Sequence, residues 1–283
     1  MSLPTAPTVA VISCGAMGAA VGKRLHDHGA RVLTDLTGRS AASRARAEAA
    51  GMQQAPVDAL AEADFFLSIL PPGEALALAR QMAGPLAKAR RKAVFVDCNA
   101  ISPMTARAVA DTIAPTGAVF VDGSIIGAPP AQGRAGPVFY LSGPQASAAM
   151  PIASLGLEVR LLEGEVGAAS GLKMCYGGIT KGVTALAAAM MLAADRCGAA
   201  PALRAEMARS LPFMLGWFET QVPGMFPKAY RWVAEMQEVS EFLADDPQSA
   251  AIYAAVAQLY ARLAEDVAGP GMETAALGAF FTR

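Results

Sequence analysis

A glycine-containing turn near the start of the chain has the chemistry of a phosphate-binding site. The apolar run Val9–Ile12 is followed by Ser13-Cys14-Gly15-Ala16-Met17-Gly18 and then by a helix-like stretch to Gly29. Glycines let the backbone approach a pyrophosphate, and the first turn of the helix supplies N–H groups and a favourable dipole. Ser13 stands where the first glycine is usual, which gives the pattern S-x-G-x-x-G. We expect this turn to bind a nucleotide diphosphate through Gly15, Ala16, Met17 and Gly18; a strand-turn-helix that binds nothing is the alternative.

Two competing selectors for the ribose of a dinucleotide follow the next strand-like run. Asp35 could accept a hydrogen bond from a ribose 2′-hydroxyl, as in proteins that bind NAD. Arg39 offers a planar fork of donors for the 2′-phosphate of NADP, and Ser40 can cap the next helix, whose N-terminus also favours an anion. Arg44 and Arg46 add positive charge nearby. We favour NADP, with NAD selected by Asp35 as the alternative.

Lys173 is the candidate group for proton transfer. It lies just inside a strongly apolar helical stretch, where a lysine is rare unless it faces a cavity. At about 100° per residue, one face of that helix carries Lys173, Tyr176, Gly177 and Thr180, with Lys181 at its edge. Two lysines that face one cavity would repel, which favours the neutral amine that proton shuttling requires. Lys181 would contact either substrate or solvent, and Tyr176 would either pack in the core or donate its hydroxyl.

The elements that position these residues alternate between strands and helices. Val32–Leu36 completes a β-α-β unit of about 30 residues with the first strand. More strand-like runs follow at Phe65–Leu70, Ala93–Asp97, Ala118–Val121, Val138–Leu141 and Leu157–Leu162. This alternation predicts an α/β fold, a mainly parallel, doubly wound sheet of the Rossmann type with ligands bound beyond the carboxyl ends of its strands.

Turn-forming residues mark several of those strand ends. They are Pro71-Pro72-Gly73, Asp97-Cys98-Asn99 and Asp122-Gly123-Ser124. We expect loops with functional side chains at each of them. Ser102-Pro103 should begin a helix, with the serine as its cap.

The pattern changes from about Glu165 onward, where strand signals vanish. We predict a dinucleotide-binding Rossmann domain over residues 1–164 and an all-helical substrate and dimerisation domain over residues 165–283. Ala185–Ala194 is apolar on every face, which predicts a helix buried on all sides. Such a helix lies at the centre of a helical domain or in a dimer core. We expect both, and therefore a homodimer through the helical domain.

Composition excludes several other classes of function. Hydrophobic residues make up 54% of the 283 residues, charged ones 17%, and the net charge is −1, which leaves no electrostatic footprint for nucleic acid or anionic lipid. The four cysteines form no C-x-x-C pair, and both histidines, His26 and His28, lie in the first helix, which argues against a zinc site and a histidine base. Reduced cysteines fit a cytoplasmic location. No uncharged apolar segment reaches the roughly 18 residues of a membrane-spanning helix.

Taken in order, these segments resemble the β-hydroxyacid dehydrogenase family, which includes 3-hydroxyisobutyrate dehydrogenase and 6-phosphogluconate dehydrogenase. The family's D-x-S-T-x-x-P segment corresponds to Asp97–Pro103, its D-A-P-V-S-G loop to Asp122–Gly127, and the segment with its catalytic lysine to Gly167–Lys173. The glycine turn with its methionine and the pair Leu70-Pro71 also match. The resemblance implies a nicotinamide cofactor, contacted in addition by Leu70, Pro71 and Asn99. It further implies Lys173 as the catalytic residue and a substrate carboxylate held by backbone N–H groups of Gly123, Ser124 and Ile125.

The chain also departs from the family's pattern. Asn99-Ala100 replaces its serine and threonine, and Gly177 replaces its asparagine one turn after the lysine, with Tyr176 beside it. Fold and cofactor class therefore transfer better than substrate. The Asn99 amide both donates and accepts, and could bridge the nicotinamide ribose and the substrate. Within the helical domain, Arg231 could clamp a second anionic group beside Trp232, or both could belong to a solvated amphipathic helix.

We therefore expect an NADP-linked oxidoreductase that interconverts a small anionic β-hydroxy acid, or a related alcohol, and its carbonyl. Lys173 would donate the proton in reduction and accept it in oxidation, and a β-keto acid product could then lose carbon dioxide. Two alternatives remain. Related folds reduce C=N bonds with an altered residue at the lysine position, so an imine reductase is one. A non-catalytic dinucleotide-binding protein is the other, and the missing asparagine fits it.

Overall fold

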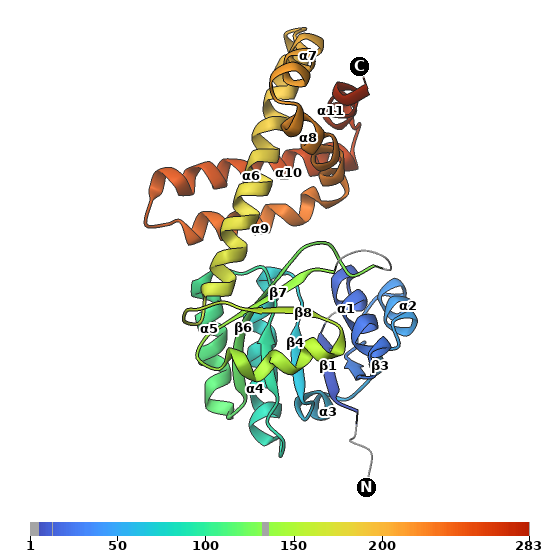
Figure 1. Cartoon of the computed structure of the whole chain (residues 1–283), viewed down its shortest axis with the longest axis vertical. Coiled ribbons are helices and arrows are strands. Elements are labelled where there is room, and N and C mark those ends of the chain that lie inside the picture. Colours follow the sequence, from blue (N-terminus) through green and yellow to red (C-terminus); the bar gives the residue numbers. More distant parts are fainter. Residues whose placement is uncertain (1–5, 13, 132–135, 283) are drawn as a thin grey trace. The chain divides into compact units, whose positions relative to one another are not determined.

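The chain forms two compact units (Figure 1). The computed structural model describes residues 6–12, 14–131 and 136–282, so Ser13 of the predicted phosphate-binding pattern lies outside the described residues. The first unit ends at Lys173 and the second begins at Met174. The division therefore falls inside one long helix, α6 (Ala168–Arg196), and not in the loop before it.

The first unit is built on one sheet with the strand order β3-β2-β1-β4-β5-β6-β7-β8. The strands are β1 (Thr8–Ile12), β2 (Arg31–Thr34), β3 (Gln53–Gln54), β4 (Phe65–Ser68), β5 (Val94–Asp97), β6 (Val119–Ile126), β7 (Val138–Ser142) and β8 (Glu158–Leu161). In the described part of the chain, β6 and β7 pair antiparallel and all the other neighbours pair parallel. The predicted doubly wound, mainly parallel sheet is confirmed. Its order reverses between β1 and β4, where sheets of this kind bind ligands.

Helices cover both faces of this sheet. They are α1 (Ala16–Asp27), α2 (Ala41–Ala49), α3 (Val57–Ala61), α4 (Ala75–Lys88) and α5 (Pro103–Ile113), with short 3₁₀ segments η1 (Pro72–Glu74), η2 (Ala114–Thr116) and η3 (Ala146–Leu155). One face packs on α1 and η3. The other face packs on α3, α4 and α5 and contains Phe66, Phe95 and Phe120. The ring centroids of Phe66 and Phe95 lie 4.8 Å apart, and those of Phe95 and Phe120 lie 6.2 Å apart. Burial of each ring contributes roughly 1.5–3 kcal/mol to this core.

Two helices begin at the predicted serine caps. Ser102 accepts a hydrogen bond from the backbone N–H of Thr105 at 3.2 Å, and Pro103 is the first residue of α5. Ser40 accepts one from the backbone N–H of Ser43 at 3.3 Å and caps α2. Each cap stabilises its helix by about 1 kcal/mol and fixes the loop before it.

One expected loop is wrong. Asp122-Gly123-Ser124 was predicted as a turn at the end of a strand, but β6 continues through these residues to Ile126. The reason is β7, which pairs antiparallel with β6 from Asp122 to Ile126 and so supplies hydrogen-bond partners beyond the end of β5. Gly123, Ser124 and Ile125 are consequently buried strand residues.

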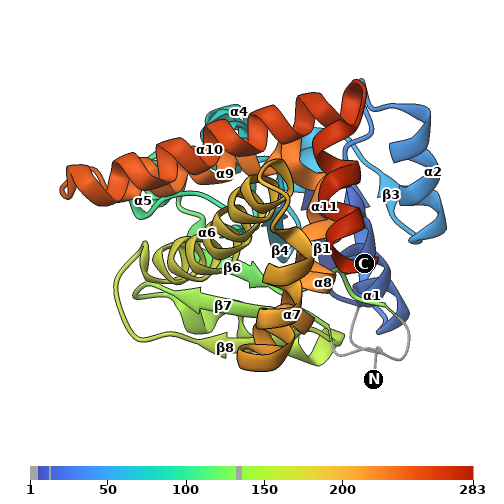
Figure 2. The ribbon, with the colours of Figure 1, turned by 90° about the horizontal axis from the view of Figure 1, so that it is seen from above.

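The second unit is all-helical, as predicted. Beside α6 it contains α7 (Ala200–Ser210), α8 (Pro212–Met225), η4 (Phe226–Lys228), α9 (Ala229–Phe242), α10 (Pro247–Ala268) and α11 (Met272–Thr282). Helices α9 and α10 form a hairpin, and α6 crosses it in the view of Figure 1 and runs beside it in the view of Figure 2. Tyr253 of α10 lies against Gly178 and Gly182 of α6, where an added Cβ would come within 3.1 and 3.4 Å of its side chain. These glycines allow the two helices to approach closely.

The prediction that α6 is buried on all sides is wrong for the single chain. Leu186 and Met190 are 59% and 62% exposed, and Tyr176 and Ile179 are 53% and 65% exposed. By length and composition alone α6 is apolar enough to cross a membrane, a test that the core helix of a soluble protein also passes. Its other face, which packs on α10, makes α6 the core helix of this unit.

Candidate active site

A row of polar side chains crosses the sheet at the carboxyl ends of β4 and β5 and at the middle of β6. Ser68, Asp97 and Asp122 are register neighbours, and Ser142 of β7 pairs with Asp122. All four are buried. Register neighbours project from the same face of a sheet, so this row lies directly beyond the stacked phenylalanine rings, two residues along each strand. The edge at which ligands bind in such sheets is thus lined by hydroxyls and two carboxyl groups.

This polar row is not among the features predicted from the sequence. The aspartates had been interpreted as turn residues. A signal was present, because the pentapeptide Ala-Val-Phe-Val-Asp occurs twice, at 93–97 and 118–122. The two copies lie on neighbouring strands and pair in register, Val94 with Val119 through Asp97 with Asp122. Two identical strands side by side bring identical residues together.

Asp122 is bonded to the first turn of α6. Its Oδ2 accepts hydrogen bonds from the backbone N–H groups of Gly167, Ala169 and Ser170 at 2.9, 3.0 and 3.2 Å. The Ser142 hydroxyl donates to the same oxygen at 2.8 Å, and the Ser170 hydroxyl donates to Oδ1 at 2.6 Å. A carboxylate at a helix N-terminus satisfies unpaired N–H groups and complements the helix dipole. Asp122 therefore caps α6 from a distant strand.

Lys173 lies one turn after this cap. Its positive charge acts on Asp97. Burial raises the pKa of Asp97 from 3.8 to about 7, although hydrogen bonds from Asn99 lower it. The charge of Asp122 raises this pKa further, and the charge of Lys173 lowers it. Lys173 also acts on the buried thiol of Cys98, whose pKa is raised mainly by burial. The predicted catalytic lysine thus lies within electrostatic range of the polar row and of Asp97, whose pKa of about 7 is close to neutral pH.

Asn99 is occupied within the protein. Its amide Nδ2 donates to Ser68 Oγ at 2.7 Å and to Asp97 Oδ2 at 3.0 Å, and its Oδ1 accepts from the backbone N–H of Leu70. Both amide hydrogens are used, so the donating half of the expected bridge to ribose and substrate is already engaged. The structure brings Leu70 and Asn99 together and ties the β4 loop, which continues into Pro71, to the β5 loop.

Ser124 is the unexpected member of this region. Its side chain is fully buried, and its Oγ has no hydrogen-bond partner among the described residues. It follows Asp122 by two residues on β6 and therefore projects from the same face. Gly123 projects from the opposite face, where an added Cβ would lie 2.9 Å from the backbone oxygen of Asp97. A buried hydroxyl without a partner is costly unless a ligand or water satisfies it.

The N-terminus of α1 fits the diphosphate of a dinucleotide. Gly15 is its cap residue, Ala16 and Met17 open the helix, and Gly18 is buried against the sheet. Among the residues that the structure describes, no side chain caps this helix and no acidic residue lies in its first turn. Main-chain N–H groups at a helix N-terminus, at the point where the strand order reverses, form a donor set suited to an anion.

The residues expected to select the ribose lie after β2. Leu36–Arg39 form a turn in which the Arg39 N–H donates to the Leu36 oxygen at 3.2 Å and Gly38 has φ +68°. Asp35 holds this turn, since its Oδ1 accepts from the Thr37 N–H at 2.8 Å. Burial alone would raise the pKa of Asp35, but hydrogen bonds from Thr37 and Gln54 and the charge of Arg39 outweigh it and keep the pKa low. The structure thus places Asp35, Arg39 and Ser40 around one turn.

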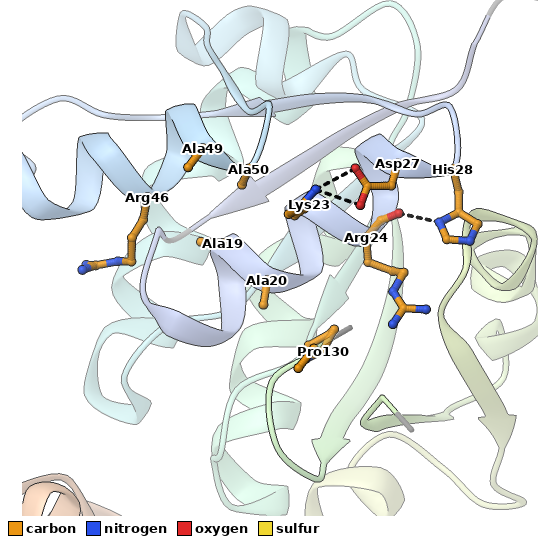
Figure 3. A pocket seen from close by; sticks show the side chains of 11 residues that line it. Ala19, Ala20, Lys23, Arg24, Asp27, His28, Arg46, Ala49, Ala50 and Pro130 are labelled. Carbon is orange, nitrogen blue, oxygen red and sulfur yellow. Dashed lines mark hydrogen bonds and ion pairs between the residues drawn. The ribbon is translucent and has the colours of Figure 1, made fainter. Parts of the chain in front are cut away.

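A separate surface groove of about 630 Å³ lies along the outer side of α1 and α2 (Figure 3). Lys23, Arg24, Asp27, Arg46 and Pro130 are among the residues that line it, and none of its described lining residues is a predicted site residue. Lys23 is paired with Asp27, with both side chains exposed. Arg46 is bonded from Nε to the Cys14 oxygen at 3.0 Å and so supports the glycine turn from behind.

The remaining predicted residues lie in the helical unit. Lys181 forms an ion pair with Glu235 of α9 in which the side chains are 18% and 17% exposed, and its ammonium lies 5.5 Å from the centre of the Trp232 ring. The charge of Lys181 is therefore balanced by Glu235. Tyr176 and Arg231 are exposed. A Cβ added to Gly177 would lie 3.5 Å from the Lys181 ammonium, so that lysine fills the space that a side chain at 177 would use.

A protein-family model described as the NAD binding domain of 6-phosphogluconate dehydrogenase matches residues 8–154. The chain belongs to this family. A second model, a domain of unknown function called DUF1932, matches residues 194–263 in the helical unit. None of the curated proteins searched matches the sequence. Family membership agrees with the glycine turn and the strand order, and it establishes a nicotinamide dinucleotide-binding domain.

Solved structures similar to this family member cover nearly its whole length. The conserved protein MTH1747, of unknown function and described as similar in structure to 3-hydroxyacid dehydrogenases, is 26% identical over 92% of this chain and 98% of its own, with a TM-score of 0.70. The 3-hydroxyisobutyrate dehydrogenase of Mycobacterium tuberculosis is 22% identical over 92% and 94%, with a TM-score of 0.72. An imine reductase from Myxococcus stipitatus is 19% identical over 98% and 100%, with a TM-score of 0.56. The predicted resemblance to β-hydroxyacid dehydrogenases is confirmed, and the fold is one that dinucleotide-dependent dehydrogenases and imine reductases share.

Proposed function

We propose that this protein is an NADP-linked oxidoreductase that interconverts a small β-hydroxy acid, or a related alcohol, and its carbonyl. The observation that carries the proposal is the position of Lys173. It lies one turn inside α6, within electrostatic range of the buried carboxyl group of Asp97, at the edge of the sheet where a dinucleotide-binding domain holds its ligand. A lysine there can exchange a proton with a hydroxyl or carbonyl oxygen while the cofactor exchanges a hydride.

In this proposal the α1 N-terminus, from Gly15 to Gly18, holds the diphosphate, and Leu70, Pro71 and the Asn99 loop line the nicotinamide half of the site. The bound cofactor supplies or accepts the hydride. The chain's own residues orient it and supply the proton. Lys173 would donate this proton in the direction of reduction and accept it in the direction of oxidation.

NADP is favoured by the turn after β2. Arg39 can approach a 2′-phosphate as a planar fork, and the N-terminus of α2, capped by Ser40, adds a favourable dipole. One oxygen of Asp35 is already used to hold the same turn, and the charge of Arg39 acts on it. Asp35 then shapes the turn that carries Arg39. The imine reductase of similar fold was solved with NADP⁺, which agrees with this choice.

The substrate would lie against the last residues of β6. Among the described strands, β6 pairs only with β7 over Gly123–Ile126. Alternate residues of this segment therefore direct their N–H groups away from β7, and a substrate carboxylate could accept hydrogen bonds from them. The Ser124 hydroxyl, which has no partner in the described structure, is a further donor. For the helical unit, we propose that the exposed Tyr176 and Arg231 contact substrate. Lys181, already paired with Glu235 beside Gly177, would hold α9 to α6.

We further propose a homodimer formed by α6, in the cytoplasm. The side chains of Ile179, Val183, Leu186 and Met190 follow a three-four spacing along one face of α6 and include no charge. A period of 3.5 residues suits pairing with a second helix, and a second copy of α6 offers the same stripe. All four cysteines are free thiols, which suits a reducing compartment.

The reaction is tested by following NADPH absorbance with a panel of β-hydroxy acids and with cyclic imines. We expect NADP⁺ reduction with at least one small β-hydroxy acid, and in Lys173→Ala a loss of about 10²–10⁴-fold in rate with cofactor binding retained. Turnover of imines alone would favour the imine reductase alternative. Cofactor binding without any turnover, and with Lys173→Ala unaltered, would favour the non-catalytic one.

A further inference from the structure

The first turn of α6 is held by a residue far away in the sequence. Asp122 uses both carboxylate oxygens, Oδ2 toward three backbone N–H groups between Gly167 and Ser170 and Oδ1 toward the Ser170 hydroxyl at 2.6 Å. The Ser142 hydroxyl donates to Asp122 at 2.8 Å and accepts from the Ala169 N–H at 2.9 Å. Strands β6 and β7 thus both hold this turn.

This cap determines the direction in which the Lys173 side chain projects from α6. Ser170 and Lys173 are three residues apart on α6 and so share a face. Side chains on a helix lean toward its N-terminus, which here is the end bonded to Asp122. Lys173 thereby comes within electrostatic reach of Asp97, the register neighbour of Asp122. A change in the attachment of the first turn would move the ammonium group away from the polar row.

We infer that Asp122 is the positioning residue of Lys173: it attaches the first turn of α6 to β6 and so fixes the lysine at the sheet edge. The inference rests on the proposed function, in which Lys173 transfers the proton, but the experiment that tests it needs no activity. Asp122 acts through the helix, and touches neither substrate nor cofactor in this role. It also accounts for the choice of an aspartate, because a carboxylate accepts at both oxygens. An asparagine has one accepting oxygen, and with that oxygen toward the helix N–H groups its NH₂ would face the Ser170 hydroxyl, which donates to Oδ1.

The test measures the reactivity of the Lys173 amine without any substrate. Wild type, Asp122→Asn and Ser170→Ala are labelled with trace acetic anhydride from pH 7 to 11, and the modification of Lys173 is quantified by mass spectrometry against the exposed Lys23. We expect the Lys173 labelling rate at pH 8 to rise about tenfold in Asp122→Asn, because the loss of the helix cap lets the amine move away from the polar row. Ser170→Ala keeps the charge of Asp122 and the backbone bonds, so a rise of about threefold there isolates position from charge.

Asp246→Asn is the matched control, because Asp246 caps α10 by the same kind of bond, from the Ser249 N–H. It should leave Lys173 labelling unchanged. Unchanged labelling in both Asp122→Asn and Ser170→Ala would overturn the inference, and if Asp122→Asn fails to fold, Ser170→Ala alone decides. NADPH titration of the wild type is run in parallel. Its failure would contradict the proposed function and leave the labelling result intact.

Discussion

At the scale of single residues, the two buried aspartates have the same sequence context and different partners. Asp122 accepts hydrogen bonds from two hydroxyls and from the N-terminus of α6. Asp97 accepts two hydrogen bonds from Asn99, which do not offset its burial, and its pKa rises to about 7. Hydrogen bonds to a carboxylate favour its charged form and burial disfavours it, and at Asp97 burial is the larger effect.

The raised pKa of Asp97 predicts an unusual dependence of stability on pH. Between pH 4 and 7 the folded chain holds a proton on Asp97 that the unfolded chain, with a pKa of 3.8, has released. The free energy of unfolding from this group therefore falls as the pH rises through that range, by at most about 4 kcal/mol. Urea unfolding at pH 4.5 and pH 7.5 measures it. In Asp97→Asn the difference between the two pH values should shrink by this contribution, and an identical pH dependence in both proteins would contradict the assignment.

Site residues whose partners are close in the sequence could be predicted, and those whose partners are distant in the sequence could not. Ser40 and Ser102 act on residues three positions away, and their caps were predicted correctly. Asp122 acts on residues 45 to 48 positions away, which no local pattern shows. The full use of Asn99 by Ser68 and Leu70 likewise depends on the pairing of β4 with β5.

At the scale of elements, the strands that were predicted are those with long apolar runs. Strand β3 was not predicted, because two exposed glutamines carry no apolar pattern and owe their pairing to β2. Strand β6 was predicted too short, because its extension depends on β7. Helix α6 was correctly expected, but which of its apolar faces is covered depends on the packing of α9 and α10 and not on its own composition.

The close approach of β5 and β6 gives a prediction for Gly123. A Cβ at this position would lie 2.9 Å from the backbone oxygen of Asp97 and 3.0 Å from Val96, inside the sheet. Gly123→Ala should therefore lower the free energy of unfolding by about 1–3 kcal/mol, because backbone cannot move away cheaply. Gly84→Ala in α4, where an added Cβ meets nothing within 4 Å, is the control and should raise stability by up to about 1 kcal/mol. Chemical denaturation of the two variants checks both signs, and a Gly123→Ala protein as stable as wild type would refute the close approach.

At the scale of the whole molecule, α6 belongs to both compact units. Its first turn is part of the sheet unit, and its remaining turns form the core of the helical unit. The apolar stripe on α6, defined above by Ile179, Val183, Leu186 and Met190, lies on the helical unit and is what the proposed homodimer would cover. An apolar stripe exposed to water favours association, because association buries it.

The dimer proposal predicts the behaviour of two charged variants. Leu186→Glu combined with Met190→Glu places two carboxylates in the centre of the stripe and should convert a dimer into a monomer, measured by sedimentation equilibrium at micromolar concentration. Ile252→Glu on α10 is the control, since Ile252 is 55% exposed but lies outside the stripe. A monomeric wild type, or a double variant that stays dimeric, would contradict the proposal.

We propose that this chain binds NADP through its glycine turn and Arg39, and a fluorescence titration with NADPH and NADH is the first measurement to make. We predict that wild type binds NADPH more tightly than NADH. Arg39→Ala should weaken NADPH binding by about 10–100-fold, the loss of a charge-assisted contact, and leave NADH binding unchanged. Arg160→Ala, on the exposed edge strand β8, should bind both as wild type does. Tighter binding of NADH would make Asp35 the selector, and binding of neither would contradict the proposed function.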